Sequence, residues 1–201
     1  FFTMIYMLLD LASILIFSIP AACLLIKYFK VFHLKKMVLL LIFTVYLSQM
    51  FDIVGIPAIQ YIRWDPNLNL IPFADIGNSR FVFQVAANAL MFLPLGFLLP
   101  LIWDSFRTWK RTLLAGFLAS LQIEFVQMFC SRATDVDDLI MNTLGCAVGY
   151  GLAWLLFHKK WPSAADNARA DQKEFICFYA IPLLVIFFLR TPLSIVIYRF
   201  L

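Results

Sequence analysis

Long apolar stretches alternate with short polar connections along the whole of this 201-residue chain. A helix that crosses a hydrocarbon core of about 30 Å needs about 20 mostly apolar residues. Six stretches meet or nearly meet that length: Thr3–Ile26, Met37–Val54, Phe81–Trp103, Thr112–Cys130, Asp138–Phe157 and Phe175–Ile197. The pattern predicts an all-α fold, a polytopic transmembrane bundle of about six spans.

Basic residues concentrate in every second connection. Of the 16 Lys and Arg residues, 11 fall between the first and second, third and fourth, and fifth and sixth segments. Lys and Arg mark cytoplasmic loops in membrane proteins. We therefore expect those three connections inside the cell and both termini outside. The expected order is two helices in residues 1–60, an outer loop at 61–80, three helices in 81–157, a cytoplasmic loop at 158–174, and a last helix with its tail in 175–201.

Composition agrees with a membrane location. The chain is 63% apolar and 14% charged, with a mean hydropathy of +0.89, which excludes an ordinary soluble domain. We expect a multi-pass protein of a bacterial plasma membrane whose partners include membrane lipids and not nucleic acid. No metal-ligand spacing, phosphate-binding loop or dinucleotide fingerprint occurs, so the sequence predicts no metal site and indicates neither a cofactor nor an oligomeric state.

The last apolar segment is interrupted. Arg190 follows about fifteen apolar residues, and Pro182 and Pro192 punctuate the segment. We expect it to cross the membrane with the Arg190 side chain reaching the outer interface, which leaves residues 193–201 as an amphipathic tail.

Polar side chains reach a common depth on three of the predicted helices. With a helical rise of about 1.5 Å per residue, Asn88 and Glu124 each lie about 12 Å below the outer surface. The spacings Glu124/Gln127 and Asp138/Asn142 each place two side chains on one helix face. We expect a ligand-binding site in the outer leaflet made by these candidates: Asn88, Glu124, Gln127, Arg132, Asp135, Asp138 and Asn142.

Simpler roles exist for several of these residues. Asn88 and Gln127 are of a type that joins helices by hydrogen bonds. Asp135 and Asp137 lie in the run TDVDD, which is a good helix start because carboxylates complement the positive end of the helix dipole. Glu124 lies where the dipole does not favour an anion, so we expect it to be protonated or paired with a cation such as Arg132.

Small residues predict close helix packing. Gly145 and Gly149 form a G-x-x-x-G pair in the fifth segment, and Gly116 and Ser120 form a similar pair in the fourth. Such pairs let helix backbones approach one another in membranes.

The same polar residues carry a family resemblance. Asn88 opens N-A-L-M-F-L-P-L-G, Glu124 and Gln127 lie in S-L-Q-I-E-F-V-Q, and Asp135 and Asn142 lie in A-T-D-V-D-D-L-I-M-N-T-L-G. Together with L-N-L-I-P-F in the outer loop and the ending L-R-T-P-L, these motifs resemble the VanZ-like membrane proteins over about residues 66–195. The apolar segment Thr3–Ile26 is extra to the five spans usual in that family.

The resemblance implies a link to antibiotic resistance. The family's founding member gives low-level resistance to teicoplanin, a lipid-tailed glycopeptide that binds peptidoglycan stem peptides. A non-enzymatic binding protein would hold a lipid-linked wall precursor, a lipid headgroup or the lipidated part of the antibiotic.

Two other classes of function remain open. A membrane enzyme acting on a lipid-linked precursor would use Glu124 as general acid or base, with Asp138 as its partner or as a ligand of Mg²⁺ or Ca²⁺. A small transporter would use the same ionisable residues in a proton relay.

Overall fold

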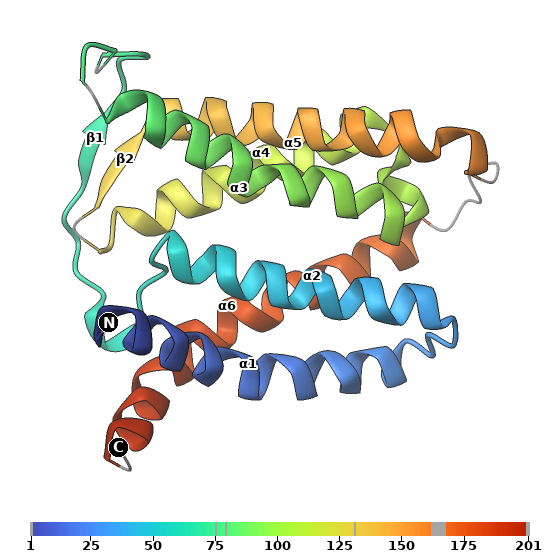
Figure 1. Ribbon diagram of the computed structural model, residues 1–201, viewed down its shortest axis with the longest axis horizontal. Coiled ribbons are helices and arrows are strands. Elements are labelled where there is room, and N and C mark those ends of the chain that lie inside the picture. Colours follow the sequence, from blue (N-terminus) through green and yellow to red (C-terminus); the bar gives the residue numbers. More distant parts are fainter. Residues whose placement is uncertain (1, 75, 79, 131, 162–167, 200–201) are drawn as a thin grey trace. The chain divides into compact units, whose positions relative to one another are not determined.

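The predicted all-α bundle is confirmed. The computed structural model describes residues 2–74, 76–78, 80–130, 132–161 and 168–199. Its long helices in this part of the chain are α1 (Phe2–Tyr28), α2 (Leu34–Ile53), α3 (Phe81–Ile102), α4 (Trp109–Gln127), α5 (Val136–Phe157) and α6 (Ala168–Arg199) (Figure 1). Short 3-10 turns occur at Ile59–Tyr61, Asp104–Arg107 and His158–Lys160, and two strands, β1 and β2, cover Asn67–Asn69 and Ala133–Asp135.

The helices form two compact units. The first contains residues 1–63 and 173–201, and therefore α1, α2 and most of α6. The second contains residues 64–172, and therefore both strands and α3, α4 and α5. The candidate site residues all belong to the second unit.

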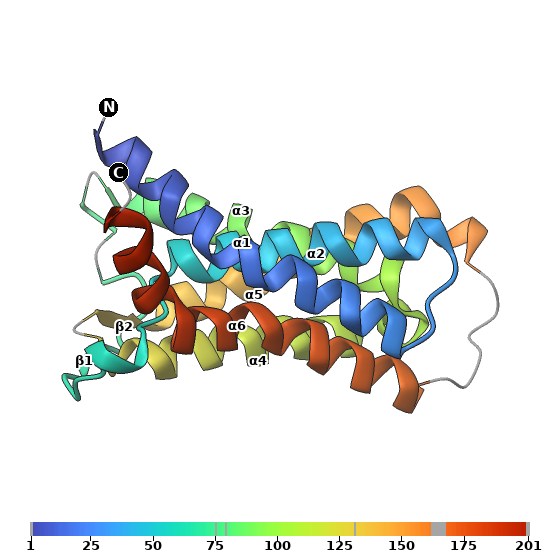
Figure 2. The same ribbon diagram turned by 90° about the horizontal axis from the view of Figure 1, so that it is seen from below.

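Aromatic side chains build the interior of the first unit. Helices α1 and α2 run side by side in opposite directions (Figures 1 and 2). The fully buried ring of Phe43 lies 6.3 Å from that of Phe175 on α6, and the ring of Phe51 lies 5.3 Å from that of Tyr179. Lys36 and Glu174 form an ion pair at 2.7 Å.

Five helices of the described chain are long and apolar enough to cross a membrane. These candidate spans are Leu11–Tyr28, Leu34–Ile53, Phe81–Ile102, Val136–Lys160 and Arg169–Leu189. Helix α4, the fourth predicted span, has 19 residues but is less apolar, because it begins with Lys110 and Arg111 and carries Glu124 and Gln127 near its end. The structure therefore confirms six helices and supports five of them as spans on composition.

Helix α6 differs in extent from the predicted last span. It is helical from Ala168, inside the stretch expected to be a loop, and continues through Pro182 and Pro192 to Arg199. The predicted tail begins within this helix, and its last two residues lie outside the described residues. An amphipathic helix can extend a span into polar surroundings without a break, since its backbone bonds are internal.

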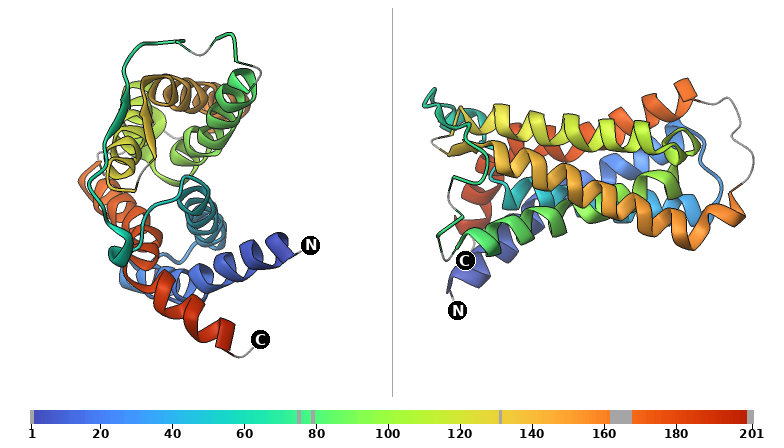
Figure 3. Two further views of the ribbon diagram at one scale, coloured as in Figure 1. Left: turned by 90° about the vertical axis from the view of Figure 1, so that its left-hand side faces the viewer. Right: turned by 90° about the horizontal axis from the view of Figure 1, so that it is seen from above.

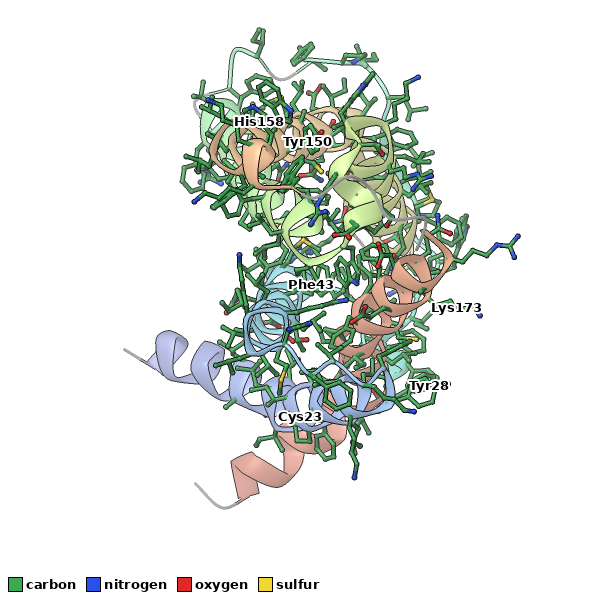
Figure 4. All side chains as sticks on the ribbon, turned by 90° about the vertical axis from the view of Figure 1, so that its right-hand side faces the viewer. Cys23, Tyr28, Phe43, Tyr150, His158 and Lys173 are labelled. Carbon is green, nitrogen blue, oxygen red and sulfur yellow. The ribbon has the colours of Figure 1, made fainter. Side chains whose placement is uncertain are left out.

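In the second unit, α5 packs on both α3 and α4. Figures 1 and 3 show α3 and α5 running in the same direction, with α4 antiparallel to α5. At the far end of this unit the Tyr150 hydroxyl, labelled in Figure 4, donates a hydrogen bond of 2.6 Å to the backbone carbonyl of Arg107. Nearby, the His158 ring stacks on that of Trp154, with ring centroids 4.3 Å apart.

Glycines bring the backbones of α3 and α5 into direct contact. A Cβ atom at Gly145 would overlap the carbonyl oxygen of Ala89, and one at Gly149 would overlap that of Leu93. From the α3 side, a Cβ at Gly96 would overlap the carbonyl oxygen of Cys146. The predicted packing role of the G-x-x-x-G pair is confirmed, with Gly96 as a third participant.

The pair of small residues on α4, Gly116 and Ser120, also has a packing role. A Cβ at Gly116 would lie 2.5 Å from the sulfur of Cys146, and Ser120 is fully buried. Both small residues therefore face α5.

A short parallel sheet was not predicted. Strand β1 from the outer loop pairs with β2, which lies directly before α5, in the register Asn67↔Ala133, Leu68↔Thr134 and Asn69↔Asp135. Figure 3 shows the two strands side by side at one end of the unit. Three residues per strand are too few for a periodic sequence pattern, which explains why the sequence did not reveal them.

Replacing Gly149 by Val should destabilise the second unit by about 1–3 kcal/mol, because the side chain would be forced into the α3 backbone. The measurement is thermal unfolding of the purified protein in detergent. Gly151→Val is the matched control, since nothing lies within 4 Å of a Cβ at Gly151. Equal stability of the two variants would contradict the proposed backbone contact.

Candidate functional site

The start of α5 is organised by its first carboxylate. Asp135 is the N-cap residue, and its Oδ1 atom accepts a hydrogen bond of 2.9 Å from the backbone N–H of Asp137. An N-cap side chain satisfies one of the N–H groups that the first helical turn leaves without an intrahelical partner. The helix-start role predicted for the TDVDD run is confirmed for Asp135.

Asp135 also reaches the neighbouring strand. Its Oδ2 atom accepts a hydrogen bond of 3.1 Å from the side-chain amide of Asn69. Both oxygens are therefore used inside the fold.

Asp137 holds the outer loop. Only 3% of this residue is exposed, and its two oxygens accept from the backbone N–H of Phe73 at 2.9 and 3.1 Å. Phe73 has a φ of +59°, a left-handed conformation that costs a non-glycine residue about 1–2 kcal/mol. The charge-assisted bond to Asp137 offsets that cost.

Glu124 is anchored to the segment before α5. It is 4% exposed, and its Oε2 atom accepts a hydrogen bond of 2.9 Å from the backbone N–H of Asp135. The Thr134 hydroxyl donates to the backbone carbonyl of Glu124 at 3.1 Å. Among the described residues its side-chain partner is thus a backbone amide rather than the predicted Arg132, which is exposed in the preceding turn.

Asp138 faces α3. Its Oδ1 atom accepts a short hydrogen bond from the side-chain amide of Asn88 and a longer one, at 3.3 Å, from Gln84. The predicted meeting of Asn88 and Asp138 is therefore present. Gln84 was missed by the sequence argument, although it lies one helical turn before Asn88.

Asn142 faces α4 instead. It is 2% exposed, and its side-chain amide donates to the Ser120 hydroxyl at 2.9 Å. Gln127, with 7% exposure, lies buried on the same α4 face as Glu124. Asp138 and Asn142 share a face of α5, as predicted, but hydrogen-bond to different helices.

A cavity of about 560 Å³ opens beside α4. Its walls come from β1, the residues after β1, α4, β2 and the start of α5: Leu68, Leu70, Leu118, Leu121, Gln122, Glu124, Phe125, Met128, Thr134, Asp135, Val136 and Leu139. Of the seven candidate residues, Glu124 and Asp135 line this space. The surface of this cavity is mainly apolar.

The hydrogen bonds divide the predicted constellation into three sets. Glu124 and Asp135 join α4 to β2, Asn88 and Asp138 join α3 to α5, and Asn142 joins α5 to Ser120. All three sets surround the first two turns of α5. In the described residues, Asp, Glu, His and Cys side chains nowhere form a group of three that could hold a metal ion.

Residues missed by the sequence argument tie the loop to α5. Asn69 and Phe73 belong to the L-N-L-I-P-F stretch, and Asp137 belongs to the TDVDD run. The signal that could have linked them was their position along the chain: the two motifs are separated by two predicted helices, which return the chain to the same membrane face. Sequence spacing cannot show which amide each carboxylate meets.

The architecture and its polar helix ends define a polytopic helical membrane protein. The sequence profile of the VanZ/LLP1 family matches residues 36–157, and the chain belongs to this family. It is 33% identical over 134 residues to Protein VanZ of Enterococcus faecium, an alignment covering 64% of this chain and 74% of that protein. No solved structure matches the chain.

The family match covers a different range from the motifs of the resemblance. It begins at residue 36, near the start of α2, and it ends with α5. Helix α1 lies outside the matched residues. Helix α6, with its L-R-T-P-L ending, also lies outside it.

Replacing Asp137 by Ala should lower the stability of the loop by about 1.5–3 kcal/mol, because the Phe73 N–H loses its charged acceptor. Hydrogen exchange of the Phe73 amide measures this directly. Asp65→Ala removes an exposed carboxylate from the same loop and should leave the exchange rate unchanged. Equal protection in the two variants would refute the anchoring role.

Replacing Asn88 by Leu should destabilise the α3–α5 contact more than replacing Gln84 by Leu. The bond from Asn88 to Asp138 is less exposed than the bond from Gln84, and hydrogen bonds to charged groups are worth about 1.5–3 kcal/mol. The measurement is the free energy of unfolding of each variant in detergent. A larger loss for Gln84→Leu would contradict this arrangement.

Proposed function

We propose that this chain is a binding protein for a lipidated or lipid-linked molecule of the bacterial cell envelope, which occupies the cavity beside α4. The observation that carries this proposal is the composition of the cavity: an apolar wall with carboxylates from Glu124 and Asp135 at one side. A molecule with an apolar tail and a polar head fits such a surface.

The size of the cavity suits part of a lipidated molecule. Small-molecule sites commonly enclose about 300–1,000 Å³, and this one encloses about 560 Å³. Leu118, Leu121 and Phe125 line it while remaining 52%, 45% and 57% exposed. In a membrane protein such side chains meet acyl chains, so a ligand tail could enter sideways from the bilayer.

The hydrogen bonds favour binding over chemistry. A nucleophile in this region would be a Ser or Thr hydroxyl. The hydroxyls of Thr134 and Thr143 donate to backbone carbonyls, and that of Ser120 accepts from Asn142. Glu124 and Asp138, the proposed acid/base pair, are held by different partners. These contacts support a fixed site that holds a ligand, and nothing among them favours a nucleophile.

The charge pattern supports an outer-leaflet position for this site, since the basic connections lie at the opposite helix ends. A site there would meet wall precursors and glycopeptides outside the cell. We propose that occupancy of this site contributes to teicoplanin-type resistance, in line with the family resemblance.

Leu121→Trp tests the cavity. The larger ring should fill it and lower the crosslinking of a photoreactive dodecyl alcohol, measured on protein in phosphatidylcholine nanodiscs, by about tenfold, which corresponds to 1.4 kcal/mol. Leu114→Trp is the matched control, because Leu114 is exposed on the same helix two turns away and does not line the cavity. Teicoplanin susceptibility of cells expressing each variant should change with Leu121→Trp alone.

Equal crosslinking in the two variants would refute binding in this cavity. Unchanged susceptibility with reduced crosslinking would refute only the link to resistance.

A further inference from the structure

The charged residues that line the cavity are all acidic among the described residues. Glu124 and Asp135 are its two charged residues, and none of the described residues that line it is Lys or Arg. The carboxylates of Asp137 and Asp138 lie in the first turn of the adjoining helix. An anionic head would therefore approach several charges of its own sign.

The two lining carboxylates differ in what they can still bind. Both oxygens of Asp135 already accept hydrogen bonds, from Asp137 and from Asn69. Glu124 uses Oε2 for the Asp135 N–H, and within the described part of the chain its Oε1 atom accepts no hydrogen bond. Glu124 is also 96% buried, since its exposure is 4%. Its Oε1 atom is thus available to a donor from a ligand in the cavity that Glu124 lines.

A carboxylate oxygen beside an apolar cavity binds a cationic donor most strongly. The hydrogen bond between an ammonium group and a carboxylate is about twice as strong as a neutral one. A phosphate at the same place would add repulsion, which low-dielectric surroundings increase.

We propose that the occupant of the cavity is a lipid-tailed molecule whose head carries a primary ammonium group, and that this group donates a hydrogen bond to Oε1 of Glu124. Its tail lies along Leu118, Leu121 and Phe125. The inference rests on the proposed function and narrows the ligand to cationic amphiphiles, as opposed to phosphate-linked wall precursors.

The test compares amphiphiles with one tail and different heads. Dodecylammonium, dodecyl phosphate and dodecanol compete with the photoreactive dodecyl alcohol for crosslinking to the whole chain in phosphatidylcholine nanodiscs. We expect dodecylammonium to compete at a concentration at least tenfold below that of dodecyl phosphate, with dodecanol between them.

Variants assign the preference to Glu124. Glu124→Gln keeps an oxygen for the Asp135 N–H but removes the charge, so the preference for dodecylammonium should fall to near the level of dodecanol. Asp65→Asn removes one exposed negative charge outside the cavity and should retain the preference.

The outcomes separate the two proposals. Equal competition by the ammonium and phosphate amphiphiles, or a preference for phosphate, would overturn the ammonium site and leave lipid binding standing. A preference that survives Glu124→Gln would overturn the role of Glu124. Crosslinking that no competitor and no Leu121→Trp substitution lowers would overturn lipid binding in the cavity itself. The comparison of heads on the unmodified chain stands even where Glu124→Gln is not recovered folded.

Discussion

Backbone N–H groups outside regular helices must find acceptors, and this requirement organises the site-bearing unit. Water does not supply acceptors inside a membrane, so an irregular segment there needs protein partners. Three carboxylates supply them in series: Glu124 accepts from the Asp135 amide, Asp135 from the Asp137 amide, and Asp137 from the Phe73 amide. The series ties the end of α4, strand β2, the start of α5 and the loop after β1 into one structure.

The second constraint is the close approach of α3 and α5. Gly145 and Gly149 leave room for carbonyl groups of α3, which fixes the two helices in register. That register brings Asn88, the residue before Ala89, to Asp138, which lies seven residues before Gly145. Packing by small residues and polar contacts therefore depend on each other: a bulky side chain at either glycine would separate the amide from its carboxylate.

The structural role and the proposed functional role coincide at Glu124. One oxygen accepts from the backbone of β2, which fixes the carboxylate, and the side chain lines the apolar cavity. A fixed acceptor selects a ligand by the donor it offers, because its position cannot adapt to a different head. The apolar wall beside it selects only for a tail. In the proposed site, the apolar wall provides affinity for the tail of the ligand, and Oε1 of Glu124 provides selectivity for its head.

The helices, their number and their small-residue contacts follow from the sequence, because apolar length and the spacing of Gly145 and Gly149 are local properties. The meeting of Asn88 with Asp138 and the helix-cap role of Asp135 were also predictable from the sequence. The pairing of β1 with β2, the bond from Phe73 to Asp137 and the mainly apolar wall of the cavity were not, since each joins residues more than sixty positions apart or depends on the direction of several side chains. The sequence determined which helices carry the polar groups and at which positions along them. Tertiary structure decided which of these polar groups meet, because a hydrogen bond requires a particular distance and angle between its donor and its acceptor.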